Sequence, residues 1–229
     1  MDQKITLSPR LLAASELVRK GAFVSDVGTD HAYLPIYLCL EGKIAGGVAS
    51  DINRGPIERA RENIEKYGLS ALLSTELTDG LRNIEKYNPD DIFVLGMGGE
   101  LIASIIDAAP WTKNADKHLC LQPMTHAEYL RDYLCKSGFA IIDERIVIEG
   151  DKIYQIILAK FVSDDFCEAL TPAELYLGRK NIEAGGHELC ALASSLLKKL
   201  ERREKGLSLS GKDPGEISSL IDEIKKYAE

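Results

Sequence analysis

The chain has 229 residues, of which 45% are hydrophobic, and a formal net charge of −8 at pH 7. Its length suits one large domain, or one domain with a smaller unit attached, built on a sizeable core. It shows neither a run of the roughly 20 apolar residues that cross a bilayer nor an apolar signal segment, so a cytoplasmic protein is expected. The acidic balance excludes recognition of nucleic acids through bulk charge, and such binding would need a local basic patch.

The five cysteines predict neither a disulfide framework nor a zinc site. They are odd in number and widely spaced, without a C-x-x-C pair. Most fall at apolar positions of predicted elements, where a reduced thiol packs as a small hydrophobic group. We therefore expect structural cysteines and no bound metal. The positions are Cys39, Cys120, Cys135, Cys167 and Cys190.

Short β-branched apolar runs alternate with segments of helical period in the first part of the chain, which predicts a parallel sheet wrapped by helices. Seven strands are predicted, at residues 22–28, 44–52, 72–78, 91–96, 118–121, 141–149 and 153–161. Helices are predicted at residues 32–40, 56–67, 99–108 and 126–137. Pro56 suits the first turn of its helix, and Gly68 and Gly138 follow two helices as stop signals.

The last two predicted strands are joined by Glu149-Gly150-Asp151-Lys152, a tight hairpin signal, so the sheet should end with an antiparallel strand. Five parallel strands followed by a terminal hairpin are typical of the class I methyltransferase fold, a Rossmann-like α/β fold with a seven-stranded sheet. A plain dinucleotide-binding fold would not usually end in this way.

The pattern changes after residue 162. Residues 163–165 are polar and resemble a linker, and leucines near heptad spacing then predict one long helix over residues 172–205. Residues 206–213 form the predicted turn, with Asp213 as the N-cap and Pro214 as the first residue of a shorter helix. Gly185 and Gly186 weaken the long helix and can break or kink it. Two domains are therefore expected, at residues 1–162 and, as a coiled-coil-like helical hairpin, at residues 163–229.

Ligands of an open parallel sheet bind beyond the carboxyl ends of the strands, where the strand order reverses. The first strand ends with Asp26 and Gly28, followed by Asp30, and lacks the G-x-G-x-x-G pattern of a pyrophosphate site. This acidic turn suits the cationic sulfonium and ammonium groups of S-adenosylmethionine better than it suits a phosphate. The alternative is that Asp26 and Asp30 only cap the next helix.

Polar residues and glycines also follow the next strands. Asp51 can accept both hydroxyls of a ribose, although it can equally cap a helix. Asp79 can bind the exocyclic amine of an adenine, and Asx-turn chemistry explains Asp79-Gly80 equally well. The run L-G-M-G-G-E, residues 95–100, implies backbone pressed against a ligand or against another strand end. Gln122 offers a donor and an acceptor after the fifth strand, whereas His126 can be a surface cap.

These motifs together resemble one family, the TrmK-type bacterial tRNA adenine-22 N1-methyltransferases. The resemblance rests on D-V-G-T-D-H-A-Y-L-P (residues 26–35), Asp51 with the following N-x-G-P, G-M-G-G, and L-Q-P. It spans residues 7–161 and implies S-adenosylmethionine as the cofactor and tRNA as the substrate. The residues that would line the cofactor are Asp26, Gly28, Asp51, Ile52, Asp79, Gly80, Gly96, Met97 and Gly98. The residues that would face the target adenine are Asp30, His31, Tyr33 and Gln122.

The resemblance also implies a simple mechanism. Adenine N1 holds a free lone pair at neutral pH, so it needs placement against the methyl group rather than deprotonation. Asp30 could stabilise the cationic methylated ring or accept a proton from its exocyclic amine. Tyr33 could stack on an extruded base or belong to the core. His31 could act as a base or only form a hydrogen bond at the start of the helix.

A tRNA must meet this acidic protein through local cations. The expected contacts with phosphates are Lys4, Arg10, Lys20, Arg54 and Arg59, with Arg19 and Arg61 close to them in sequence. A second basic group near the end of the long helix is either a grip on an arm of the tRNA or a solvated helix face. Its members are Lys198, Lys199, Arg202, Arg203 and Lys205. A monomer or weak homodimer is expected.

Three other functions stay open at this point. The acidity favours a methyltransferase that acts on a small molecule or a protein. A non-catalytic Rossmann-like binding protein would have no need of the carboxylates and the glycine turn. A nicotinamide oxidoreductase is disfavoured by the missing phosphate fingerprint and the terminal hairpin.

Overall fold

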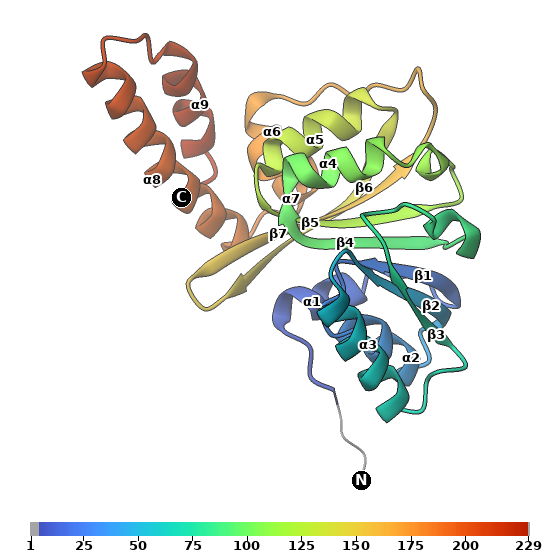
Figure 1. Cartoon of the computed structure of the whole chain (residues 1–229). Coiled ribbons are helices and arrows are strands. Elements are labelled where there is room, and N and C mark those ends of the chain that lie inside the picture. Colours follow the sequence, from blue (N-terminus) through green and yellow to red (C-terminus); the bar gives the residue numbers. More distant parts are fainter. Residues whose placement is uncertain (1–4, 229) are drawn as a thin grey trace.

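The computed structural model of the chain describes residues 5–228. Seven strands form one mixed sheet in the order β3-β2-β1-β4-β5-β7-β6 (Figure 1). The first five strands are parallel, and β7 runs antiparallel to both β5 and β6. This sheet confirms the predicted class I methyltransferase fold. The strands are β1 (Ala22–Val27), β2 (Ile44–Asp51), β3 (Leu73–Leu77), β4 (Asp91–Gly98), β5 (His118–Thr125), β6 (Phe139–Glu149) and β7 (Lys152–Phe161).

Helices cover both faces of the sheet and extend beyond it at the carboxyl end of the chain (Figure 1). The helices are α1 (Pro9–Ser15), α2 (Tyr33–Leu40), α3 (Arg54–Lys66), α4 (Gly99–Asp107), α5 (Ala127–Lys136), α6 (Pro172–Leu177), α7 (Arg179–Ala184), α8 (His187–Leu209) and α9 (Gly215–Lys225). Helices α1 to α3 lie on one face, and α4 and α5 lie on the other. Within residues 5–228, no helix is both long and apolar enough to span a membrane.

The alternation of side chains along each strand produces two apolar layers, one on each face of the sheet. On β4, Phe93 belongs to the layer under α1 to α3, while Ile92 and Val94 belong to the layer under α4 and α5. All three are fully buried, as the period of two in a strand requires. Cys120 and Cys135 are also buried, and burial raises the pKa of the Cys135 thiol to about 11, which fits the structural role predicted for it.

The ends of β4 and β5 and the presence of α1 differ from the prediction. Strands β4 and β5 continue to Gly98 and Thr125, beyond the predicted ends at residues 96 and 121, because the two strands stay paired through two register shifts. Helix α1 was not predicted at all, since its seven residues are too few to show a clear period.

The prediction of a single helix over residues 172–205 is wrong, whereas the break that the sequence allowed at Gly185 and Gly186 is confirmed. Three helices, α6, α7 and α8, occupy this stretch, and α8 extends to Leu209. The breaks fall at Gly178 (φ +88°) and at Gly185 and Gly186 (φ +65° and +91°), all in the left-handed region that ends a right-handed helix. Helix α9 begins at Gly215, one residue after the predicted start. Its N-cap is Pro214 and not the predicted Asp213, and no side chain caps the helix. Asp213 instead stabilises the preceding turn, where its Oδ1 accepts a hydrogen bond from the Gly215 N–H at 2.9 Å.

A buried ion pair ties the C-terminal helices to the sheet. Arg131 on α5 donates from Nε to Glu144 Oε1 on β6 at 2.7 Å, and both side chains are fully buried. Glu144 Oε2 accepts from the backbone N–H of Lys180 at the start of α7 (3.0 Å). A Cβ at Gly178 would lie 2.6 Å from both Glu144 oxygens. The break between α6 and α7 therefore lies at a glycine, because a side chain at this position would collide with the Glu144 carboxylate.

Replacing Arg131 by Met should lower the free energy of unfolding by about 3–5 kcal/mol, because it leaves the Glu144 carboxylate buried without its cation. Urea denaturation measures this change. The matched control is Lys136→Met on the same helix, whose ion pair with Asp132 is exposed and should contribute less than about 1 kcal/mol. Equal losses in the two variants would contradict this account of the buried pair.

Candidate functional site

The strand order reverses between β1 and β4, and the carboxyl ends of β2, β1 and β4 lie side by side at that point. The helices that follow β1 and β4 leave the sheet toward opposite faces (Figure 1). A crevice at this edge is the place where open α/β sheets bind ligands. The sequence placed its candidate residues at these same strand ends.

Asp26, near the end of β1, is a buried carboxylate. Burial raises its pKa to about 6, the hydroxyl of Thr29 opposes this by donating to Oδ2 at 2.5 Å, and the negative charge of Asp51 adds to the rise. A carboxylate that is desolvated and faces a second carboxylate gains stability when a cation arrives. The site is therefore electrostatically suited to a positively charged group and unsuited to a phosphate.

The turn between β1 and α2 has a strained backbone on both sides of His31. Asp30 (φ +49°) and Ala32 (φ +56°) both adopt the left-handed region, which non-glycine residues rarely enter. Asn63 on α3 donates from Nδ2 to the His31 carbonyl at 3.0 Å. The Asp30 carboxylate lies 3.0 Å from Arg59 Nη2 and 3.3 Å from His31 Nε2.

Tyr33 is not a core residue, because 43% of its surface is exposed. Its ring stacks on the His31 ring, with centroids 5.1 Å apart and planes inclined by 13°. Of the two alternatives that the sequence left open for Tyr33, the structure excludes the core position. The stacked pair presents an aromatic surface next to the Asp30 carboxylate.

The tips of β2 and β3 carry the next candidates. Asp51 Oδ1 accepts a hydrogen bond from the Asn53 N–H at 2.8 Å and so stabilises the turn. The negative charge of Asp51 also raises the pKa of Asp26. Ile52 is 62% exposed at the same tip. Asp79 is exposed, and Gly80 (φ +56°) packs so closely on α4 that a Cβ would lie 3.2 Å from Ile105.

The glycines at the end of β4 and the start of α4 have different roles. A Cβ at Gly99 would lie 2.2 Å from the His126 carbonyl oxygen, so this glycine presses against the end of β5 rather than against a ligand. Gly96 (φ +78°) has an open surface beside Arg10. Met97 places its terminal methyl over Gly28, where a Cβ would lie 2.4 Å from it. The β1 and β4 tips are therefore in direct contact.

Gln122 on β5 is almost completely buried. Its Oε1 accepts from Arg10 Nη1 at 3.0 Å, and its Nε2 donates to the Pro123 carbonyl at 2.9 Å. The Arg10 guanidinium also lies over the ring of Tyr154, 5.7 Å from its centroid. Sequence reasoning assigned Arg10 to RNA phosphates and missed this contact, since nothing in the sequence pairs two residues that lie 112 positions apart.

The other predicted RNA contacts are not all near this edge. Arg54 and Arg59 are exposed on α3 beside the β2 tip. Lys20 is exposed just before β1, at the amino ends of the strands, and the neighbouring Arg19 binds Asp91 at the start of β4. The basic residues that the sequence grouped in the first 20 positions are thus separated. Lys4 lies outside the described residues.

Possible metal ligands do not cluster in the described part of the chain, which has no group of three or more His, Cys, Asp or Glu side chains that could hold a metal ion. His126 at the start of α5 contacts Glu128 through Nδ1 at 3.1 Å and is exposed, as a surface cap would be.

Comparisons with known proteins agree with this geometry. A family described as a methyltransferase domain matches residues 7–157. A tRNA (adenine(22)-N(1))-methyltransferase of Bacillus subtilis (strain 168) is 40% identical over 157 residues, which are 69% of this chain and 66% of that protein. The aligned segment thus spans slightly less than two thirds of that relative's length.

The crystal structure of the B. subtilis M1A22 tRNA methyltransferase TrmK is similar over almost the whole chain, with 30% identity, a TM-score of 0.87, and 98% of this chain and 99% of that one covered. The chain belongs to the TrmK family of methyltransferases. A TrmK of M. capricolum, solved in complex with S-adenosyl-homocysteine, is 27% identical with a TM-score of 0.77 and covers 98% of each chain. A protein of Streptococcus agalactiae in the NADB-Rossmann superfamily is 30% identical with a TM-score of 0.89 over the whole of both chains. The likeness therefore includes the helices after β7.

In this TrmK-family member, replacing Arg10 by Ala should lower the free energy of unfolding by about 1–3 kcal/mol, because the buried Gln122 Oε1 loses its donor. Urea denaturation checks the stability, and a single-turnover methyl-transfer assay should show a slower rate because the β5 tip is no longer fixed. Arg145→Ala is the control, since the Arg145–Glu16 ion pair is on the surface and should contribute under about 1 kcal/mol. An Arg10 variant as stable and as fast as the control would remove Arg10 from the site.

Proposed function

We propose that this chain transfers the methyl group of S-adenosylmethionine to N1 of the adenine at position 22 of tRNA. The whole-length likeness to the B. subtilis TrmK structure carries the proposal. The acidic crevice at the β1–β4 reversal supports it independently, because its buried Asp26 favours a cation. We further propose that the protein acts in the cytoplasm as a monomer or weak homodimer, with a catalytic domain at residues 1–162 and a helical domain at residues 163–229.

The cofactor would lie across the strand tips. When bound, S-adenosylmethionine supplies an electrophilic methyl group on a sulfonium. Asp26 would interact with its cationic amino acid part, Asp51 would accept the ribose hydroxyls, and Asp79 would accept from the adenine amine. Ile52, which is exposed beside Asp51, would cover one face of that adenine. Backbone close to the cofactor would come from Gly28, Gly80, Gly96 and Gly98. Met97 would lie between the β1 and β4 tips, with its methyl group against Gly28.

The target adenine would lie between the β1–α2 turn and the β5 tip. Its N1 lone pair needs only correct placement, so most of the rate enhancement would come from alignment. Tyr33, stacked on His31, offers a ring on which an extruded base can stack. Asp30 would stabilise the positive charge of the methylated ring, or accept the proton from its exocyclic amine. Gln122, fixed between Arg10 and Pro123, would border the base from the β5 side.

Incubation of the protein with unmodified tRNA and radiolabelled S-adenosylmethionine, followed by nucleoside mapping, tests this function. The label should appear in N1-methyladenosine and should be lost when the adenine at position 22 is replaced by guanine. The net charge of −8 favours the second candidate, a methyltransferase for small molecules or proteins. Label found only in those fractions would establish that candidate and reject the tRNA activity.

The affinity for S-adenosylmethionine should fall as the pH drops through 6. The pKa of Asp26 is raised to about 6, so the group is protonated below this pH and loses its attraction for a cation. If the bound cation holds Asp26 ionised, the dissociation constant should be about tenfold higher at pH 5 than at pH 7. Calorimetry at a series of pH values measures it.

The control for this pH dependence is Asp26→Asn, which should bind weakly and equally at both pH values. The same variant should be more stable than the wild type at pH 7, because an Asp with a raised pKa destabilises the folded state once it is ionised. An Asp26→Asn protein that keeps the full pH dependence would exclude Asp26 as its source.

A further inference from the structure

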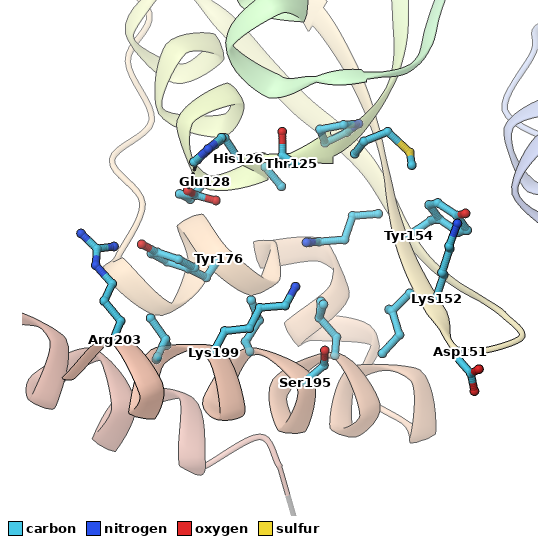
Figure 2. A pocket seen from close by; sticks show the side chains of 18 residues that line it. Thr125, His126, Glu128, Asp151, Lys152, Tyr154, Tyr176, Ser195, Lys199 and Arg203 are labelled. Atoms are coloured by element: carbon cyan, nitrogen blue, oxygen red, sulfur yellow. Dashed lines mark hydrogen bonds and ion pairs between the residues drawn. The ribbon is translucent and has the colours of Figure 1, made fainter. Parts of the chain in front are cut away.

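A cleft of about 590 Å³ opens beside the proposed catalytic edge (Figure 2). Its walls are the β5–α5 turn, the β6–β7 hairpin, α6 and α8. It begins at Pro123 and Met124, the two residues that follow Gln122. One end of the cleft therefore lies next to Gln122, which is proposed to border the target adenine, and the cleft separates the sheet from the C-terminal helices.

The cleft combines an apolar floor with cations at its rim. Leu192 and Leu196 of α8 form part of the floor, and Tyr176 forms a wall. Figure 2 shows Lys199 and Arg203 rising from α8 on either side of Tyr176, on the side of the helix that faces the β5–α5 turn. The acidic residues that line the cleft are less available, since Glu128 contacts His126 at 3.1 Å and Asp151 lies at the hairpin tip.

Lys199 and Arg203 form no ion pair or side-chain hydrogen bond with any residue in the range 5–228. They are four residues apart, which is about 6 Å along a helix axis, so they can bind two successive phosphates. Arg203 is close enough to Tyr176 to lower the pKa of its hydroxyl, although burial and Glu128 raise it by more. Arg203, which has no ion-pair partner among the described residues, thus lies near the aromatic ring of Tyr176.

The walls of the cleft are held rigidly. Arg131 donates to Gln155 Oε1 at 2.7 Å and to the Leu175 carbonyl at 2.7 Å, and it lies 3.4 Å from the Tyr176 carbonyl. Gln155 and Tyr176 both line the cleft. The ion pair that joins the C-terminal helices to the sheet therefore also fixes two walls of this cleft before any ligand binds.

We propose that the cleft binds one unstacked nucleotide of the tRNA strand next to the target adenine, with its base against Tyr176 and the leucines and its flanking phosphates on Lys199 and Arg203. Aromatic surfaces combined with cations are how proteins hold single-stranded nucleic acid. This inference rests on the proposed tRNA methyltransferase function. It divides the basic group of α8 in two, because Lys198 and Arg202, which have the same spacing, do not line the cleft.

The double variant Lys199→Gln/Arg203→Gln tests the phosphate contacts. We expect KM for tRNA to rise about tenfold and the slope of log affinity against log salt to decrease by about 2, with kcat and the affinity for S-adenosylmethionine unchanged. The matched control is Lys198→Gln/Arg202→Gln, which removes the same charge from the same helix. It should change KM less than about twofold. Equal effects of the two double variants would overturn the proposal.

An abasic nucleotide in the tRNA tests the base contact. Removing the base on one side of the target adenine should weaken binding to the wild type about tenfold, the scale of one base–aromatic stack. The Tyr176→Leu variant should bind the abasic tRNA and the intact tRNA with equal affinity. Tyr129→Leu, which changes an exposed tyrosine of α5 outside the cleft, should behave as the wild type. Intact and abasic tRNAs that bind the wild type equally would overturn the proposal.

A failure of the cleft proposal can be distinguished from a failure of the proposed function. A wild-type protein that forms no N1-methyladenosine in intact tRNA rejects the tRNA activity itself. A wild-type protein that methylates tRNA normally, with cleft variants that bind as well as their controls, rejects only the cleft as a nucleotide site.

Discussion

The reversal of strand order between β1 and β4 is the constraint on which the rest of the site depends. Because the strands of this part of the sheet are parallel, their carboxyl ends meet at one edge, and the chain leaves β1 and β4 toward opposite faces. Side chains from separate parts of the sequence are thereby brought together without any loop longer than a few residues. Asp26 and Asp51 come close enough for one to raise the pKa of the other. The acidity of the crevice thus follows from topology as much as from composition.

The sequence predicted the features that local pattern determines. Short β-branched apolar runs located the seven strands. The position of Asp26, Gly28 and Asp51 at the ends of those strands located the site, because the carboxyl ends of parallel strands share an edge. Contacts between distant segments could not be predicted in this way. The hydrogen bond from Arg10 to Gln122 joins α1 to β5, and the helix break at Gly178 accommodates a carboxylate from β6. Both depend on tertiary packing, which the local periodicity of the sequence does not indicate.

The proposed activity on tRNA requires an acidic protein to keep two electrostatic tasks apart, the binding of a cationic cofactor and the binding of phosphates. The carboxylates gather at the tips of β1 and β2, where a cationic cofactor would offset them. The cations available for phosphates lie on either side of that edge, on α3 and on the inner face of α8. Lys20, at the opposite edge of the sheet, takes no part in this arrangement. A net charge of −8 is therefore compatible with RNA binding, since the local field at the approach to the site decides association.

Calorimetric titration of S-adenosylmethionine into the wild type, Asp51→Ala and Asp30→Ala tests most directly whether carboxylates at the strand tips hold the cofactor. Loss of hydrogen bonds to a charged group amounts to about 1.5–3 kcal/mol, so the Asp51 variant should bind at least about tenfold more weakly. The Asp30 variant should keep wild-type affinity while its methyl-transfer rate falls. An Asp51→Ala protein that binds S-adenosylmethionine as tightly as the wild type would contradict the account.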